Sequence, residues 1–206
     1  MDFDIKSMKQ RAKTLLKETK PHPLGVGAIF TVFIAAYMII SFATMASDCF
    51  WIAFIVMELL YLNIRSSCNW YALKVTREEA TQISDVVIAY KERPIGMFFL
   101  GVIKNICYII GFCMCYVGFF IPFYGFRFSV YIMRDDKVNP FVALGRSIKL
   151  LKGSYLQLLK LDISNLGWYA LMVVTLGIAG FYVKPYTSIV YAEFYDYLKT
   201  KKAMLA

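Results

Sequence analysis

The chain has 206 residues, of which 59% are hydrophobic and 17% aromatic, while only 18% are charged. An ordinary soluble domain is about 45–50% apolar, so this composition leaves too little polar surface for a water-soluble globule and predicts an integral membrane protein. The formal net charge of +9 is explained by cations gathered in cytoplasmic loops, and no RNA-binding motif or zinc spacing accompanies it, so we expect no nucleic-acid partner.

Residues 1–23 carry six cations and are predicted to form a cytoplasmic amphipathic segment. Apolar side chains recur near helical spacing between Ile5 and Leu16. This pattern is typical of a helix that lies on the inner membrane surface.

Residues 24–46 contain no charged side chain and are long enough to cross a hydrocarbon core of about 30 Å. We predict that they form the first crossing, leaving the cytoplasm. A tight turn follows, and the chain returns from Phe50 to about Ile64 as a second crossing that contains Glu58. The basic stretch 65–93 is then predicted to be cytoplasmic and to include a second interfacial helix.

A third crossing is predicted from Ile95 to Phe120, interrupted by Lys104 and Asn105. The segment "IPFYGFRFSVYIM", residues 121–133, is predicted to return as a short fourth crossing. It is shorter than the roughly 17–25 residues expected of a crossing, so a tilted segment, a re-entrant segment or a continuation through "RDDKV" to about residue 137 stays open. Its cation, Arg127, either extends outward to the interface or pairs inside the bundle.

Residues 155–174 and 181–198 complete the predicted topology as the fifth and sixth crossings. In this arrangement all but three of the 23 Lys and Arg residues lie on the cytoplasmic side; the exceptions are Lys104, Arg127 and Lys160. A scheme with four crossings does not give that partition. We therefore predict an all-α, polytopic membrane helix bundle with six spans arranged as three hairpins. It forms one domain over residues 24–200, with a tail at 201–206 and both termini in the cytoplasm.

Polar and ionisable side chains within the predicted crossings are candidate functional residues, because a charge at mid-bilayer costs about 2.5–3.5 kcal/mol on insertion scales. Glu58 and Lys104 both lie about 12–15 Å deep, counted from opposite sides at 1.5 Å per residue, so we predict that they pair. Such a pair is either a structural contact between two helices or part of a substrate or proton pathway. The full candidate set is Glu58, Lys104, Asn105, Arg127, Asp162 and Asn165.

A basic stripe follows the fourth predicted crossing. Arg146, Lys149 and Lys152 recur at intervals of three residues and are predicted to contact anionic lipid headgroups, at about 1 kcal/mol each.

The sequence lacks the residues of common hydrolytic sites. His22 is the only histidine and precedes the first predicted crossing, and no phosphate-binding glycine loop is present. We therefore expect no catalytic activity, no metal and no cofactor. The first functional hypothesis is an accessory or scaffold component that binds an unidentified membrane protein; the alternative is a small transporter or lipid-handling protein with a charged intramembrane cavity.

Several segments together resemble a bacterial family of integral membrane proteins known only as a domain of unknown function. That family is similar in pattern to the membrane domain of some glycerophosphodiester phosphodiesterases. The resemblance implies a six-helix fold in the bacterial cytoplasmic membrane and no particular reaction. The segments that carry it are "MKQRAKTLLK", "IPFYGFRFSVYIM", "NPFVALGRSIKLLKG", "LDISNLGWYALMVVTLGIAGFYVKPY" and "AEFYDYLK".

Overall fold

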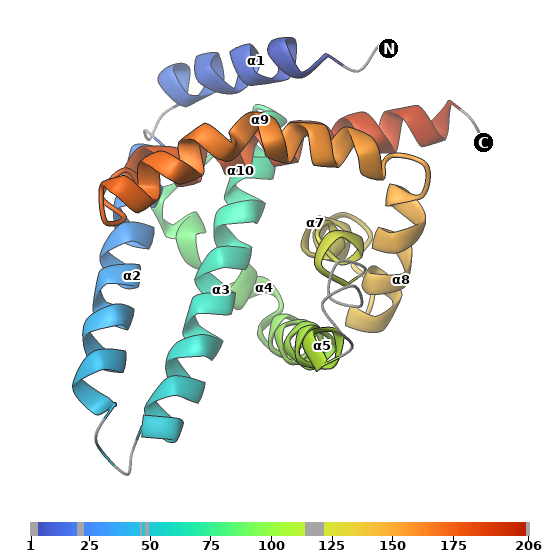
Figure 1. The fold of residues 1–206 in the computed structure, drawn as a ribbon. Coiled ribbons are helices and arrows are strands. Elements are labelled where there is room, and N and C mark those ends of the chain that lie inside the picture. The colour runs from blue at the N-terminus through green and yellow to red at the C-terminus, as the bar shows by residue number, and fades with distance from the viewer. Residues whose placement is uncertain (1–3, 20–22, 46, 48–49, 114–121, 205–206) are drawn as a thin grey trace.

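Figure 1 shows a computed structural model of the chain, which describes all residues except 1–3, 20–22, 46, 48–49, 114–121 and 205–206. Within the described residues the regular structure is helical and no strand occurs, which confirms the all-α prediction. His22 lies outside the described residues. The elements are α1 (Ile5–Glu18), α2 (Leu24–Thr44), α3 (Phe50–Thr76), the 3₁₀ helix η1 (Ile83–Val87), α4 (Ile88–Glu92), α5 (Pro94–Cys113), α7 (Ser129–Asp135), α8 (Pro140–Leu151), α9 (Tyr155–Val174) and α10 (Gly180–Ala203).

The N-terminal helix α1 has the predicted amphipathic character. The carboxylate of Asp4 caps it by accepting hydrogen bonds from two backbone N–H groups of the first turn, at 2.9 and 3.2 Å. Ala12, Leu15 and Leu16 are buried on its apolar face. Because α1 packs mainly on α10, this face covers protein, whereas the sequence predicted that it rests on a membrane surface.

The helices α2 and α3 form an antiparallel hairpin (Figure 1). Among the described helices, α2 is the one that is long and apolar enough to cross a membrane, and only 17% of its most apolar stretch is buried inside the protein. The helix α5 contributes a shorter apolar stretch, Pro94–Tyr108. Length and composition therefore support one of the six crossings that the sequence predicted.

The helix α3 is longer than the predicted second crossing. It continues past Ile64 to Thr76, without a Gly or Pro to interrupt it. The sequence had assigned Arg65 to a cytoplasmic loop because cations follow it. In the structure Arg65 lies inside the helix. Together with its polar neighbours Ser66 and Asn69 it lines an internal cavity, which is described below.

The predicted fourth crossing is not a continuous helix. The chain is helical at 122–125, turns at 126–128, and then forms α7, which has only seven residues, about 10 Å of helix. The hydroxyl of Ser147 on α8 stabilises the break: it donates to the carbonyl of Gly125 at 2.5 Å and accepts from the N–H of Phe128 at 3.2 Å. All residues from Ser129 to Met133 are buried, so α7 packs inside the bundle and the predicted single short helix is replaced by two helical pieces joined by a turn.

A second hairpin, α9 and α10, runs across the end of the first one, where α2 begins and α3 ends (Figure 1). The two hairpins cross, whereas six spans arranged as three hairpins were predicted from the sequence. At the crossing, α10 approaches α2 so closely that a Cβ added at Gly27 would lie 2.0 Å from the carbonyl oxygen of Phe181. Only glycine fits at this position.

Charged side chains join α3, α7 and α10 at one end of the bundle. Asp135 accepts two hydrogen bonds from Arg77, at 2.7 and 2.8 Å, one from Lys199 at 2.8 Å and one from the Tyr195 hydroxyl at 3.1 Å. Arg77 also donates to Asp196 at 2.7 Å. Burial acts to raise the pKa of Asp135, but the hydrogen bonds from Arg77 and Lys199 outweigh it and lower that pKa to about 2.

We expect this network to make the fold sensitive to acid. A carboxyl whose pKa is about 3.9 in the unfolded chain and about 2 in the fold stabilises the fold by about 2 kcal/mol above pH 4. That contribution is lost as the pH falls through the folded-state pKa. Thermal unfolding in detergent at pH 7, 4 and 2.5 measures it, with Asp135→Asn as the comparison. The wild type loses more stability than the variant between pH 4 and 2.5; equal losses would contradict the assignment.

Candidate functional site

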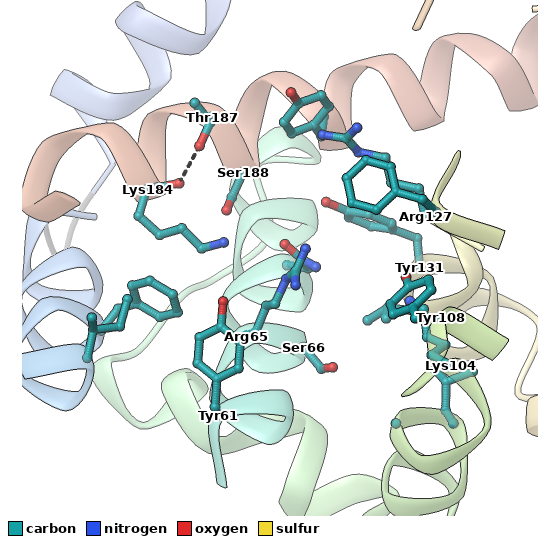
Figure 2. A pocket seen from close by; sticks show the side chains of 18 of the residues that line it. Tyr61, Arg65, Ser66, Lys104, Tyr108, Arg127, Tyr131, Lys184, Thr187 and Ser188 are labelled. Carbon is teal, nitrogen blue, oxygen red and sulfur yellow. Dashed lines mark hydrogen bonds between the residues drawn. The ribbon is translucent and has the colours of Figure 1, made fainter. Parts of the chain in front are cut away.

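A cavity of about 300 Å³ lies where the two hairpins, α5 and the turn before α7 meet (Figure 2). Its lining combines apolar, aromatic, hydroxyl and cationic side chains. The apolar part includes Phe30, Ile34, Leu100, Phe123 and Met172. The uncharged polar and tyrosine groups are Ser66, Asn69, Thr187, Ser188, Tyr61, Tyr108, Tyr131, Tyr169 and Tyr191.

Four cations from separate parts of the chain line this cavity: Arg65 on α3, Lys104 on α5, Arg127 before α7 and Lys184 on α10. Figure 2 shows the side chains of Arg65 and Lys184 reaching into its middle. All four charged groups line the same cavity and therefore repel one another. Cations from distant segments are therefore held near one another despite their repulsion.

Arg127 is paired inside the bundle, which decides between the two positions that the sequence left open. Its guanidinium donates to the carboxylate of Asp162 on α9 at 2.7 Å. The same guanidinium lies 4.1 Å from the centre of the Tyr191 ring, whose hydroxyl donates to Asp162 at 2.6 Å. Tyr169 extends the group, with its hydroxyl 3.0 Å from that of Tyr191. Asp162 thus compensates one of the four cavity cations.

The other three cations have no carboxylate partner in the part of the chain that the structure describes. Lys184 places its ammonium 4.8 Å from the centre of the Phe30 ring. The side chain of Glu58 lies outside the described residues, so its pairing with Lys104 stays a prediction. Arg65 is exposed and Lys104 and Lys184 are half-buried, so a ligand can reach all three.

The two candidate asparagines do not line the cavity. Asn105 is half-buried on α5. Asn165 is fully buried on α9, and neither polar atom of its amide has a hydrogen-bond partner among the described residues. Of the predicted set, the structure brings together Lys104, Arg127 and, through its bond to Arg127, Asp162.

The predicted basic stripe is exposed at the surface but is partly used in contacts within the protein. Arg146 forms an ion pair with Asp136 at 2.5 Å. The carbonyl of Lys149 accepts a hydrogen bond from the ammonium of Lys202. Lys152 is exposed and directly follows α8. Contact of these three cations with lipid headgroups stays a prediction.

Sequence reasoning missed Arg65 and Lys184, which it had grouped with cytoplasmic cations. The helical spacing of polar residues around each of these two cations could have indicated that both face the inside of the bundle. On α3, Tyr61, Arg65, Ser66 and Asn69 recur at intervals that place them on one face. On α10, the residues Lys184, Thr187, Ser188 and Tyr191 do the same.

The second half of the chain matches a known family model. Residues 114–202 match the family described as "Protein of unknown function (DUF975)". This stretch contains Arg127, Asp162, Lys184 and Tyr191, whereas Arg65 and Lys104 precede it. No curated protein and no solved structure matches the chain. The match therefore relates residues 114–202 to a family of unknown function. It assigns no role to the cavity.

Proposed function

We propose that this chain is an integral membrane protein that binds an anionic ligand in the cationic cavity, as a small transporter or lipid-handling protein. The strongest support comes from three cations that line the cavity: Arg65, Lys104 and Lys184. None of them pairs with a carboxylate among the residues that the structure describes. Uncompensated charges in a low-dielectric bundle are costly. A bound anion would compensate them, so the cavity is suited to accept one.

The exposed apolar surface supports placement in a membrane. Helix α2 exposes Val32, Met38, Ile39 and Phe42, and α9 exposes several large apolar residues, among them Ile163. The proposal places the chain in a bacterial cytoplasmic membrane with both termini inside, which rests on the distribution of cations along the sequence. Relatedness to the membrane domain of some glycerophosphodiester phosphodiesterases rests on the sequence segments alone.

An accessory or scaffold role is the other candidate. Exposed apolar faces suit lipid as well as a protein partner, so they favour neither. The cavity, by contrast, calls for a ligand of defined charge. We propose binding without catalysis, since the one histidine, His22, precedes α2.

Anion binding is testable with the purified, delipidated protein in detergent. We expect an anionic amphiphile at about 100 times its Kd to stabilise the fold by about 2.7 kcal/mol, which raises the Tm by about 5–10 °C. A zwitterionic amphiphile with the same chain should have little effect. The double variant Arg65→Gln/Lys184→Gln should lose most of the response, because it removes half of the cavity cations.

Lys17→Gln is the matched control, because it removes an exposed cation of α1 that lies away from the cavity. It should respond to the anionic amphiphile like the wild type. Equal stabilisation by the anionic and zwitterionic amphiphiles, or an undiminished response in the double variant, would contradict the proposal.

A further inference from the structure

We infer that the ligand of the cationic cavity carries a phosphate monoester group. The inference rests on the proposed anion binding and narrows it to one chemical class. It is drawn from three features of the cavity: the number of uncompensated cations, the kinds of hydrogen-bond donor, and the apolar part of the lining.

Charge favours a dianion. After Asp162 has compensated Arg127, three lining cations have no carboxylate partner among the described residues, and two would remain if Glu58 pairs with Lys104 as the sequence predicts. A carboxylate or a phosphate diester brings one negative charge, whereas a phosphate monoester carries about −1.5 to −2 at pH 7. The monoester therefore relieves more of the repulsion among Arg65, Lys104 and Lys184 than a singly charged group does.

The donors favour a group with several acceptor oxygens. Arg65 presents a planar guanidinium that donates to two oxygens of a phosphate at once, while the ammonium groups of Lys104 and Lys184 act as compact charges with three N–H bonds each. Ser66 and Ser188 add hydroxyls to the same cavity. Three terminal oxygens of a monoester use this set more fully than the two oxygens of a carboxylate.

The remaining lining leaves room for an organic body beside the phosphate. A phosphate group alone does not fill a cavity of about 300 Å³, and Phe30, Ile34 and Met172 form an apolar part of the wall. That surface suits the glycerol and first acyl carbons of a lipid, and equally the body of a small soluble phosphate ester. The chemistry common to both is the phosphate monoester.

Binding of headgroups on matched chains tests the inference in the wild-type protein. The probes are dioctanoyl phosphatidic acid (a monoester), dioctanoyl phosphatidylmethanol (a diester) and dioctanoylglycerol hemisuccinate (a carboxylate), with glycerol 3-phosphate as the soluble monoester. We expect phosphatidic acid to bind at least about tenfold more tightly than the diester or the carboxylate. In Arg65→Gln this preference should shrink several-fold, and in Lys17→Gln it should be unchanged.

The outcomes separate this inference from the proposed function. Similar affinities for all three amphiphiles, each weakened by Arg65→Gln, would overturn the monoester assignment while supporting anion binding. Failure of every anion to bind would overturn both. If glycerol 3-phosphate competes as strongly as phosphatidic acid, the assignment stands with a soluble ligand; if only the lipid binds, it stands with a lipid ligand.

Discussion

Gly27→Ala should destabilise the protein by at least about 3 kcal/mol. The added methyl group would lie 2.0 Å from the carbonyl oxygen of Phe181 and 2.9 Å from the ring of Pro185. Backbone atoms cannot move aside as a flexible side chain does, so α2 and α10 must separate. The cavity should suffer too, because these helices supply Phe30 and Lys184. Chemical or thermal unfolding in detergent measures the loss.

Gly25→Ala provides the control for this prediction. It lies two residues earlier on the same helix, and an added Cβ there would meet no atom of the described residues within 4 Å. Because alanine favours helix by up to about 1 kcal/mol over glycine, this variant should be neutral or slightly stabilised. If the two variants unfold alike, the close crossing of α2 and α10 is wrong.

Asp162→Asn should lower the stability of the ligand-free protein and raise its affinity for an anion. Asparagine keeps the shape and can still bond Tyr191, but it leaves Arg127 without a counter-charge beside three other cations. We expect the ligand-free protein to lose about 2–3 kcal/mol, less than for a fully buried pair because both side chains are partly exposed. The affinity for an anion should rise about tenfold, since the cavity gains one net positive charge.

Glu79→Gln is the matched control for the second prediction. Glu79 pairs with Arg134 at 2.7 Å, but its side chain is 41% exposed and does not line the cavity. Loss of this ion pair should lower the free energy of unfolding by less than about 1 kcal/mol and leave the affinity for anions unchanged. A variant Asp162→Asn that is as stable as the wild type, or that binds anions more weakly, would argue against the cavity as an anion site.

Sequence reasoning found those cavity residues that interrupt long apolar runs. Lys104 and Arg127 have few charged neighbours in the sequence, so the cost of burying them marked both as candidates. Arg65 and Lys184 were assigned to the cytoplasmic side instead, because Arg65 begins a cation-bearing polar stretch and Lys184 was counted with the C-terminal cations. The rule that cytoplasmic loops are rich in Lys and Arg describes averages over loops. It cannot identify individual cations, such as these two, that point into the helix bundle.

Contacts between distant segments account for the other differences between the predicted and the observed fold. The helix of α1 and its apolar face follow from local spacing, and both were predicted. The break at 126–128 depends on Ser147, which lies about twenty residues later on α8. The crossing at Gly27 depends on Phe181. Neither partner can be identified from the spacing of apolar residues along one segment, because that spacing reports which face is buried and not what covers it.

The central claim is that a water-accessible, positively charged cavity exists inside the bundle. It is tested most directly by thiol labelling of Ser66→Cys, in a protein whose five native cysteines have been replaced. Methanethiosulfonate reagents of similar size but opposite charge are compared, with Ser84→Cys at an exposed position as the reference. We predict that the anionic reagent labels position 66 at least about tenfold faster than the cationic one, relative to position 84. No labelling at position 66, or faster labelling by the cationic reagent, would contradict the claim.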